Sequence, residues 1–277
     1  MLIRYGYEIT IAADAPLPLI AQMSARPERK LDLRGPERFA TDPGVAFSTY
    51  LDGYGNFCHR LTAPEGRFTL TSDAVIADHG MPDAEDLSAE ELPIEALPDD
   101  VLLYVMPSRY CDSDLMGAVA WETFGSVPRG WRRVQAISDW AHDRLRFDYQ
   151  RADATRTGYD AFQARTGVCR DFTHLAITAC RALNIPARYV NGHLGDIGIP
   201  PVPDPMDFCA WMEVYLSGRW WTFDPRNNAR RIGRVVLGYG RDAADVALIS
   251  SFGAHRLEGF KVWCDEVDAA GNVVVQG

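Results

Sequence analysis

The sequence predicts an α+β protein in which a β-rich N-terminal region precedes helices and then antiparallel strands. Up to about residue 78, apolar and polar side chains alternate between glycine-containing turns such as DGYGN and PEGR. Residues 81–100, MPDAEDLSAEELPIEALPDD, interrupt this alternation with prolines and acids and predict a surface linker. Beyond the linker the apolar spacing becomes helical. We therefore expect a β-rich domain with its acidic linker over residues 1–100 and a second domain over residues 101–277.

The N-terminal segment predicts a strand, because Ile3, Tyr5, Tyr7 and Ile9 alternate with Leu2, Arg4, Gly6 and Glu8. The stretch VAFSTYLDGYGNFCHRLTAPEGRFTLTSDAVIAD alternates in the same manner, as expected for an antiparallel meander. The order of these segments places the β-rich region ahead of the helices.

Two later stretches predict helices, and strands follow them. PRGWRRVQAISDWAHDRLRFDYQ places five apolar residues at helical spacing: Trp131, Val134, Ile137, Trp140 and Leu145. TGYDAFQARTGVCRDFTHLAITACRALNIP places another set on one helical face: Phe172, Leu175, Ala176, Ala179 and Leu183. Pro186 ends this helix, and ARYVNGH, the hairpin CAWMEVYLSGRWWTF and the tail RLEGFKVWCDEV predict strands.

Charge and hydropathy narrow the classes of partner and the compartment. The net charge of -10 and the pI near 5.1 argue against nucleic acid and anionic membrane surfaces, which bind concentrated Lys and Arg. The sequence lacks the roughly 18 consecutive apolar residues of a membrane span. Its first residues also lack the basic flank and cleavage site of a signal peptide. We expect a cytoplasmic protein.

Cysteine spacing argues against a metal or redox motif. The six cysteines form no CxxC pair: Cys58, Cys111, Cys169, Cys180, Cys209 and Cys264. Four of them are expected to be buried thiols. Convergence of Cys169, Cys209 and His193 on a metal ion lacks the tight ligand spacing of a metal site. We therefore expect no metal ion and no cofactor.

Cys169 is the candidate nucleophile. It stands in RTGVCRDF, directly after a glycine-containing turn and at the start of the predicted helix. The N–H groups and partial positive charge of a helix start favour a thiolate and can stabilise an oxyanion beside it. The alternative is a small core residue. Asp224, in WTFDPRNN, ends a strand where a carboxylate could orient a catalytic ring, although an Asp before Pro is also a common turn residue.

Three motifs in one order, GVCRDFTHLAITACRALNIPARYV, AWMEVYLSGRWW and TFDP, resemble the bacterial transglutaminase-like superfamily. The resemblance covers about residues 115–265 and implies a papain-like cysteine-proteinase fold for the second domain. It also implies a Cys-His-Asp triad in which Cys169 is the nucleophile and Asp224 the acid. The residue before Ala-Trp is usually the family histidine, and here it is Cys209.

A cysteine at this position weakens the triad chemistry. A thiol with a pKa of about 8.5 accepts a proton at neutral pH less readily than an imidazole with a pKa of about 6.5, and it forms no thiolate–imidazolium pair. His193 ends a predicted strand and could approach the cleft as a substitute base or a substrate contact. A hydrogen-bonded loop histidine is the alternative. Trp211 is expected in the cleft wall or the core.

The sequence supports three functional hypotheses. The first is a cysteine-dependent peptidase, amidase or transamidase, a hydrolase-type acyl transfer on a peptide or amide substrate. The second is a non-catalytic member that binds a peptide-like ligand, and the third is a cleft controlled by a reversible Cys169–Cys209 disulfide. The basic run RNNARRIGR could hold an acidic substrate or form a solvated loop. The oligomeric state is open.

Overall fold

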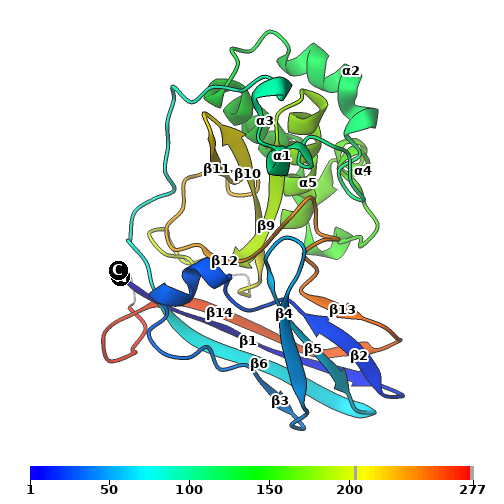
Figure 1. Ribbon diagram of the computed structural model, residues 1–277, viewed down its shortest axis with the longest axis vertical. Helices are drawn as coiled ribbons and strands as arrows, with labels where there is room; N and C mark the ends of the chain where they lie inside the picture. Colours follow the sequence, from blue (N-terminus) through cyan, green and yellow to red (C-terminus); the bar gives the residue numbers. More distant parts are fainter. Residues whose placement is uncertain (203–204, 275–277) are drawn as a thin grey trace.

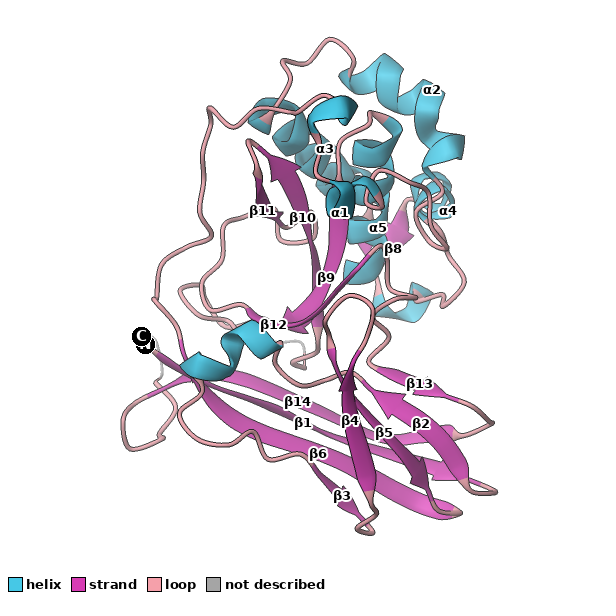
Figure 2. Cartoon of the chain, viewed as in Figure 1, coloured by secondary structure: helices cyan, strands magenta, loops and turns pink. Residues whose placement is uncertain are grey.

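The computed structural model describes residues 1–202 and 205–274 of the chain. Figure 1 shows helices gathered at one end of the molecule and long antiparallel strands at the other. Figure 2 shows strands β10 and β11 beside the helices, and β9 and β12 reaching toward the strand-rich end. The mixed α and β architecture confirms the α+β class predicted from the sequence.

Two antiparallel sheets form the strand-rich end. The first has the order β14-β1-β6-β3: Arg256–Val267, Leu2–Ala13, Gly66–Ala77 and Ala40–Asp42. The second has the order β13-β2-β5-β4: Ile249–Ser251, Leu17–Ala21, Phe57–Ala63 and Phe47–Leu51. Alternate residues of β1, among them Tyr7, Ile9 and Ile11, are buried in a core with Leu19 and Phe68. Period-two burial of apolar side chains therefore holds this end of the molecule together.

The other end pairs helices with a third sheet, which has the order β11-β10-β9-β12: Arg219–Phe223, Cys209–Leu216, Ala187–His193 and Val235–Gly240. The helices are α1 to α5: Asp99–Leu102, Ser113–Phe124, Trp131–Arg144, Gly158–Ala164 and Cys169–Ala182. Short elements complete the described chain: β7 (Arg146–Phe147), β8 (Thr166–Gly167) and the 3₁₀ helices η1 (Pro27–Asp32), η2 (Ile94–Ala96) and η3 (Tyr149–Arg151).

Helix α5 is the centre of the helical end. It contacts α2, α3 and α4 and also lies against β9 and β10 of the third sheet. Most of its apolar residues are buried, and Ala210, Met212 and Val214 of β10 meet them from the sheet side. The helix therefore cannot shift without disturbing both layers, which fixes the position of its first residue, Cys169.

The elements predicted from apolar spacing are confirmed. Helix α3 covers the segment that begins at Trp131, α5 begins at Cys169, and β9 and β14 coincide with ARYVNGH and RLEGFKVWCDEV. The sheets cross the boundary expected at residue 100, because β14 pairs with β1 along its length and β13 pairs with β2. The C-terminal strands thus complete the N-terminal sheets.

No helix within the described ranges 1–202 and 205–274 is long and apolar enough to span a bilayer.

The close pairing of β1 with its neighbours predicts a sharp effect at Gly6. A Cβ at this position would lie 2.5 Å from the indole ring of Trp263 and against the carbonyl oxygen of Ser72. Gly6→Ala should therefore lower the free energy of unfolding by about 1–3 kcal/mol in a urea titration. The matched control is Gly53→Ala, because a Cβ at Gly53 meets no atom within 4 Å. Equal stability of the two variants would contradict this packing.

Candidate functional site

Cys169 is the first residue of α5, and the turn before it is stabilised by a buried carboxylate. An Asp171 side-chain oxygen accepts a hydrogen bond from the Val168 N–H at 2.9 Å and lies 3.3 Å from a guanidinium nitrogen of Arg156. A side chain on Gly167 would come within 2.6 Å of that carboxylate, so glycine suits this position. Asp171 therefore forms the helix start, as its first-turn position favours, and Cys169 remains partly exposed.

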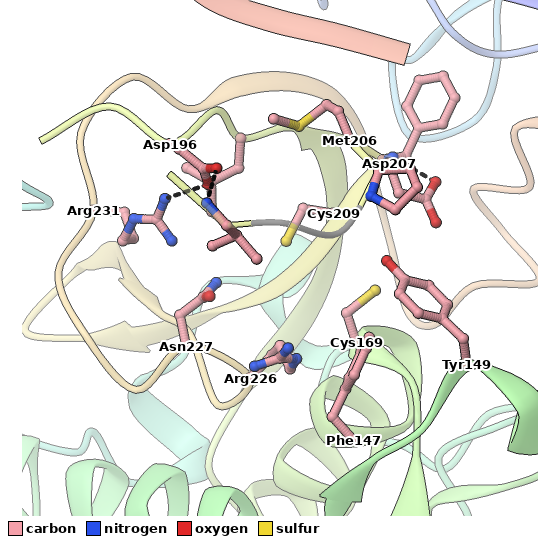
Figure 3. Close-up of a pocket in the computed structure, with 14 residues that line it drawn as sticks. Phe147, Tyr149, Cys169, Asp196, Met206, Asp207, Cys209, Arg226, Asn227 and Arg231 are labelled. Carbon is pink, nitrogen blue, oxygen red and sulfur yellow. Dashed lines mark hydrogen bonds and ion pairs between the residues drawn. The ribbon is translucent and has the colours of Figure 1, made fainter. Parts of the chain in front are cut away.

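Cys209 is the first residue of β10 and lies in the same hollow as Cys169. The N–H of the next residue, Ala210, points at the Cys169 sulfur together with the N–H of Arg170. Figure 3 shows both sulfurs in this hollow. All six cysteines, each within the described residues, are free thiols. The start of β10 thus meets the start of α5.

Asp224 directly follows β11, and its carboxylate is buried and hydrogen-bonded. The backbone N–H and the side-chain amide of Asn227 each donate to it at 2.9 Å, and an Arg234 Nη donates at 2.8 Å. Burial, and then the charge of Asp224, raises the pKa of the Cys209 thiol. The charges of Asp224 and of a Cys169 thiolate both act on the Cys209 thiol. Asp224 does not line the hollows that Cys169 and Cys209 share, and its carboxylate lines a separate hollow beside Trp131 and Ser138.

The basic run RNNARRIGR is mostly committed to structural contacts. The guanidinium of Arg234 lies between Asp224 and Asp83, at 2.8 and 2.9 Å. The Arg231 N–H donates to Asp83 at 2.9 Å, and Arg230 donates to the Asp83 carbonyl oxygen. Burial lowers the pKa of Arg234, but the two carboxylates outweigh this effect and leave it raised overall. Through these contacts the loop binds Asp83 of the acidic linker, and Arg234 connects Asp83 to the Asp224 carboxylate.

The Cys169 thiol is strongly held in its protonated form. Burial raises its pKa to about 11, and the negative charge of Asp207 contributes in the same direction. The N–H groups of Ala210 and Arg170 and the charge of Arg226 oppose this shift without overcoming it. The sequence-based expectation that the helix start yields a lowered thiol pKa is therefore wrong, because removal of water outweighs the N–H groups.

Two hollows meet at the cysteine pair and share Cys169, Asp207, Phe208 and Cys209 in their walls. The narrower one encloses about 120 Å³. Its other walls come from β7, η3 and two loops: Phe147, Tyr149, Leu194, Asp196, Val202, Pro205, Met206, Arg226, Asn227 and Arg231. The wider one encloses about 530 Å³, and Tyr110, Tyr189 and the segment 243–249 are among its walls. An extended ligand that passes over Cys169 would occupy both.

The two residues expected to contact substrate lie elsewhere. His193 is fully buried, with its ring centre 5.2 Å from that of Tyr5 and 4.8 Å from that of Phe208. Burial lowers the pKa of His193 to about 3, so it is neutral at pH 7. Trp211 is also fully buried, and its ring lies 4.7 Å from the guanidinium carbon of Arg234. Neither residue lines the hollows beside Cys169, because Tyr5 and Phe208 pack on the His193 ring and the Arg234 guanidinium lies over the Trp211 ring.

The structure adds Asp207 to the site, which the sequence did not single out, and assigns individual contacts to two residues of the basic run, Arg226 and Asn227. Asp207 lies two residues before Cys209 and faces both hollows, and burial raises the pKa of its carboxyl. Asn227 holds Asp224, and Arg226 lies beside Cys169 (Figure 3). The sequence signal for Asp207 was its closeness to Cys209, and the signal for Arg226 and Asn227 was their place in the basic run after Asp224. Across the described ranges, no group of three or more His, Cys, Asp or Glu is placed to hold a metal ion.

Known proteins resemble this chain in sequence and fold. The model of the transglutaminase-like superfamily matches residues 119–225. An uncharacterised protein of Mycobacterium tuberculosis is 33% identical over 236 residues, covering 76% of this chain and 73% of that protein. One from Mycobacterium leprae is 28% identical, with 76% and 77% covered. A crystal structure from Cytophaga hutchinsonii, called a "putative cysteine protease", has a TM-score of 0.84 at 29% identity and covers 100% of this chain and 94% of its own.

Arg234 should be essential for stability. Arg234→Met leaves Asp83 and Asp224 buried without their shared cation, so we expect the free energy of unfolding to fall by about 3–5 kcal/mol in a urea titration. The exposed pair Arg256–Asp14 provides the control, and Arg256→Met should change stability by less than about 1 kcal/mol. A small effect of Arg234→Met would show that the cluster is dispensable.

The raised pKa of Cys169 predicts a characteristic pH profile of alkylation. A thiol with a pKa of about 11 is protonated at pH 7, and its thiolate fraction grows tenfold with each pH unit below the pKa. The rate of Cys169 modification by iodoacetamide, followed by peptide mass spectrometry, should therefore rise about tenfold per unit from pH 7 to pH 10. N-acetylcysteine amide, the control, should level off near its ordinary thiol pKa. A rate at Cys169 that is already constant near pH 7 would contradict the profile.

Proposed function

Because this chain belongs to the transglutaminase-like superfamily, we propose that Cys169 is the nucleophile of an acyl transfer on a peptide or amide substrate. In this proposal Cys209 and Asp224 occupy the places of the other two triad members. The observation that carries it is the placement of Cys169 at a helix start and in the walls of two hollows, with two backbone N–H groups directed at its sulfur.

The proposed step is attack by the Cys169 sulfur on the substrate carbonyl. The S–C bond forms, the thiol proton leaves, and the tetrahedral oxyanion collapses to a thioester as the C–N bond breaks and the amine takes a proton. Water or a second amine then releases the acyl group, which gives hydrolysis or transamidation. N–H groups at the start of α5 are suited to stabilise the oxyanion.

The cysteine at position 209, where the family usually has a histidine, is the reason that we propose a low activity. An imidazole there would accept the thiol proton and return it to the leaving amine, whereas the Cys209 thiol has a pKa raised by burial and then by Asp224. Asp224 is itself held by Arg234 and Asn227. We therefore infer a weak hydrolase. The description of the Cytophaga hutchinsonii protein as a "putative cysteine protease" supports hydrolysis of a peptide bond as the reaction class.

Two alternatives keep the same cleft and give it a different role. In the first, the hollows bind a peptide-like ligand without chemistry. In the second, Cys169 and Cys209 join in a reversible disulfide that blocks the nucleophile. The observation that favours the second is the presence of two free thiols in one hollow (Figure 3). Six free cysteines also support our proposal that the protein works in a reducing compartment, the cytoplasm.

Restoring the histidine tests the proposal. Cys209→His should raise the rate of p-nitrophenolate release from p-nitrophenyl acetate by about 10²–10⁴, because a general base then takes the proton of Cys169. In the same variant, Cys169 should become acetylated by the ester, which peptide mass spectrometry detects as a mass gain of one acetyl group. Cys209→Ser, which offers no base, is the matched control and should remain at the wild-type level.

Cys169→Ala in the Cys209→His background should abolish the gain. If Cys209→His folds like the wild type by circular dichroism but leaves the rate unchanged, the cleft is a binding site and the acyl-transfer proposal fails. If the wild-type rate rises after treatment with dithiothreitol, and its alkylation at Cys169 rises with it, the disulfide alternative is supported instead.

A further inference from the structure

Arg226 is a cation in the narrow hollow that the described part of the protein leaves unpaired. Its guanidinium carbon lies 3.9 Å from the centre of the Phe147 ring and 5.9 Å from that of Phe172. Within residues 1–202 and 205–274, its side chain has neither a carboxylate within ion-pair distance nor a hydrogen-bond acceptor. Aromatic faces hold a guanidinium in place while its N–H groups stay available to a ligand.

The other cations around the cysteines are already occupied. Arg231 donates to the Gly195 carbonyl oxygen at 2.8 Å and lies 3.9 Å from Asp196. Arg170, on the side of the wider hollow, donates to the Asp153 carbonyl oxygen and lies 3.6 Å from Asp171. Arg234 is bound by two carboxylates. Arg226 is therefore the cation of this group that retains its hydrogen-bonding capacity for a substrate.

We propose that Arg226 binds a free carboxylate of the substrate, and that the substrate class is a peptide or amide with a carboxylate close to the scissile bond. Assignment of this carboxylate to a substrate rests on the proposed function. A guanidinium beside the nucleophile recognises a carboxylate through two parallel N–H donors, which adds direction as well as attraction. A C-terminal residue, or a side chain that carries a carboxylate, has this chemistry.

The remaining charges of the cleft favour the same orientation. In Figure 3, Asp207 and Arg226 lie on opposite sides of Cys169. Asp207 faces both hollows and Asp196 lines the narrow one, where Asp196 lies 3.9 Å from Arg231. The two hollows differ in Arg226, which lines the narrow one alone and offers its donors there. The substrate carboxylate therefore belongs in the narrow hollow, and the uncharged or cationic part of the substrate extends into the wider one.

Two nearly isosteric alkylating agents measure this preference without any turnover. Iodoacetate and iodoacetamide react with the same thiolate, so the ratio of their rates at Cys169 cancels the thiolate fraction. We take the ratio as the iodoacetate rate over the iodoacetamide rate and divide it by the same ratio for N-acetylcysteine amide. In the wild type, the result should exceed one. Arg226→Gln should lower it about tenfold, because a charge-assisted hydrogen bond contributes on the order of 1.5–3 kcal/mol. Arg226→Lys, which keeps the charge, should retain most of the preference.

Arg146→Gln is the matched control. Arg146 precedes Phe147 and has the same charge, but its side chain is 80% exposed and does not line the hollows. An unchanged ratio in this variant together with a loss in Arg226→Gln supports the carboxylate site. The proposal is overturned if the ratio is the same in the wild type and in all variants, or if Arg226→Gln and Arg146→Gln lower the ratio equally. If Arg226→Gln does not fold, the wild-type ratio is measured from about 20 mM to 1 M NaCl, where screening should reduce it. A ratio of one at every salt concentration also overturns the proposal.

The outcome is independent of the acyl-transfer test. If Cys209→His shows no gain in rate, the acyl-transfer proposal fails, and the ratio of the two alkylation rates still tests whether Arg226 binds an anion. If Cys209→His is active but the iodoacetate-to-iodoacetamide ratio is one, the acyl-transfer proposal is retained and the proposal of a substrate with a carboxylate is rejected.

Discussion

The contact on which the site depends is the buried cation of Arg234 between Asp83 and Asp224. One guanidinium joins the acidic linker to the Asp224 carboxylate in the loop after β11. Removing ions from water is costly, and the cost is offset only where each charge has its partner and its hydrogen bonds. Asp224 has this set from Arg234 and Asn227. The carboxylate thus stays in place although no imidazole is present to hold it.

Cys169 illustrates how two local rules compete in one place. Its position at the start of α5 directs backbone N–H groups at the sulfur, which stabilises a thiolate. The same packing that fixes α5 between the other helices and β10 removes water from the sulfur, and Asp207 adds a negative charge. Desolvation is the larger effect, so the thiol stays protonated. In a complete triad the imidazolium would reverse this balance, and the Cys209 thiol cannot.

Local sequence predicts elements better than it predicts their partners. The alternation of Ile3, Tyr5 and Tyr7 predicted a strand correctly, because period-two burial is a property of the strand itself. It could not predict that Tyr5 pairs with Cys264, since alternation specifies a buried face and leaves the neighbouring strand open. The enclosure of His193 has the same origin. Its ring is covered by Tyr5, which comes from the first strand of the chain, and by Phe208, which comes from the loop that leads into β10.

The basic loop shows why a charge run alone does not predict a binding site. Four arginines stand within RNNARRIGR, and the sequence assigns them the same potential role. Three of them are used by acceptors within the protein, among them the carboxylate and carbonyl oxygens of Asp83. Arg226 differs because its guanidinium rests on the Phe147 ring, and an aromatic face attracts the charge without consuming its N–H donors. A cation can bind a ligand only with the N–H donors and the charge that its neighbours in the protein have not already paired. This capacity depends on the fold, and in this cleft the cation that retains it, Arg226, lies beside Cys169, the proposed nucleophile.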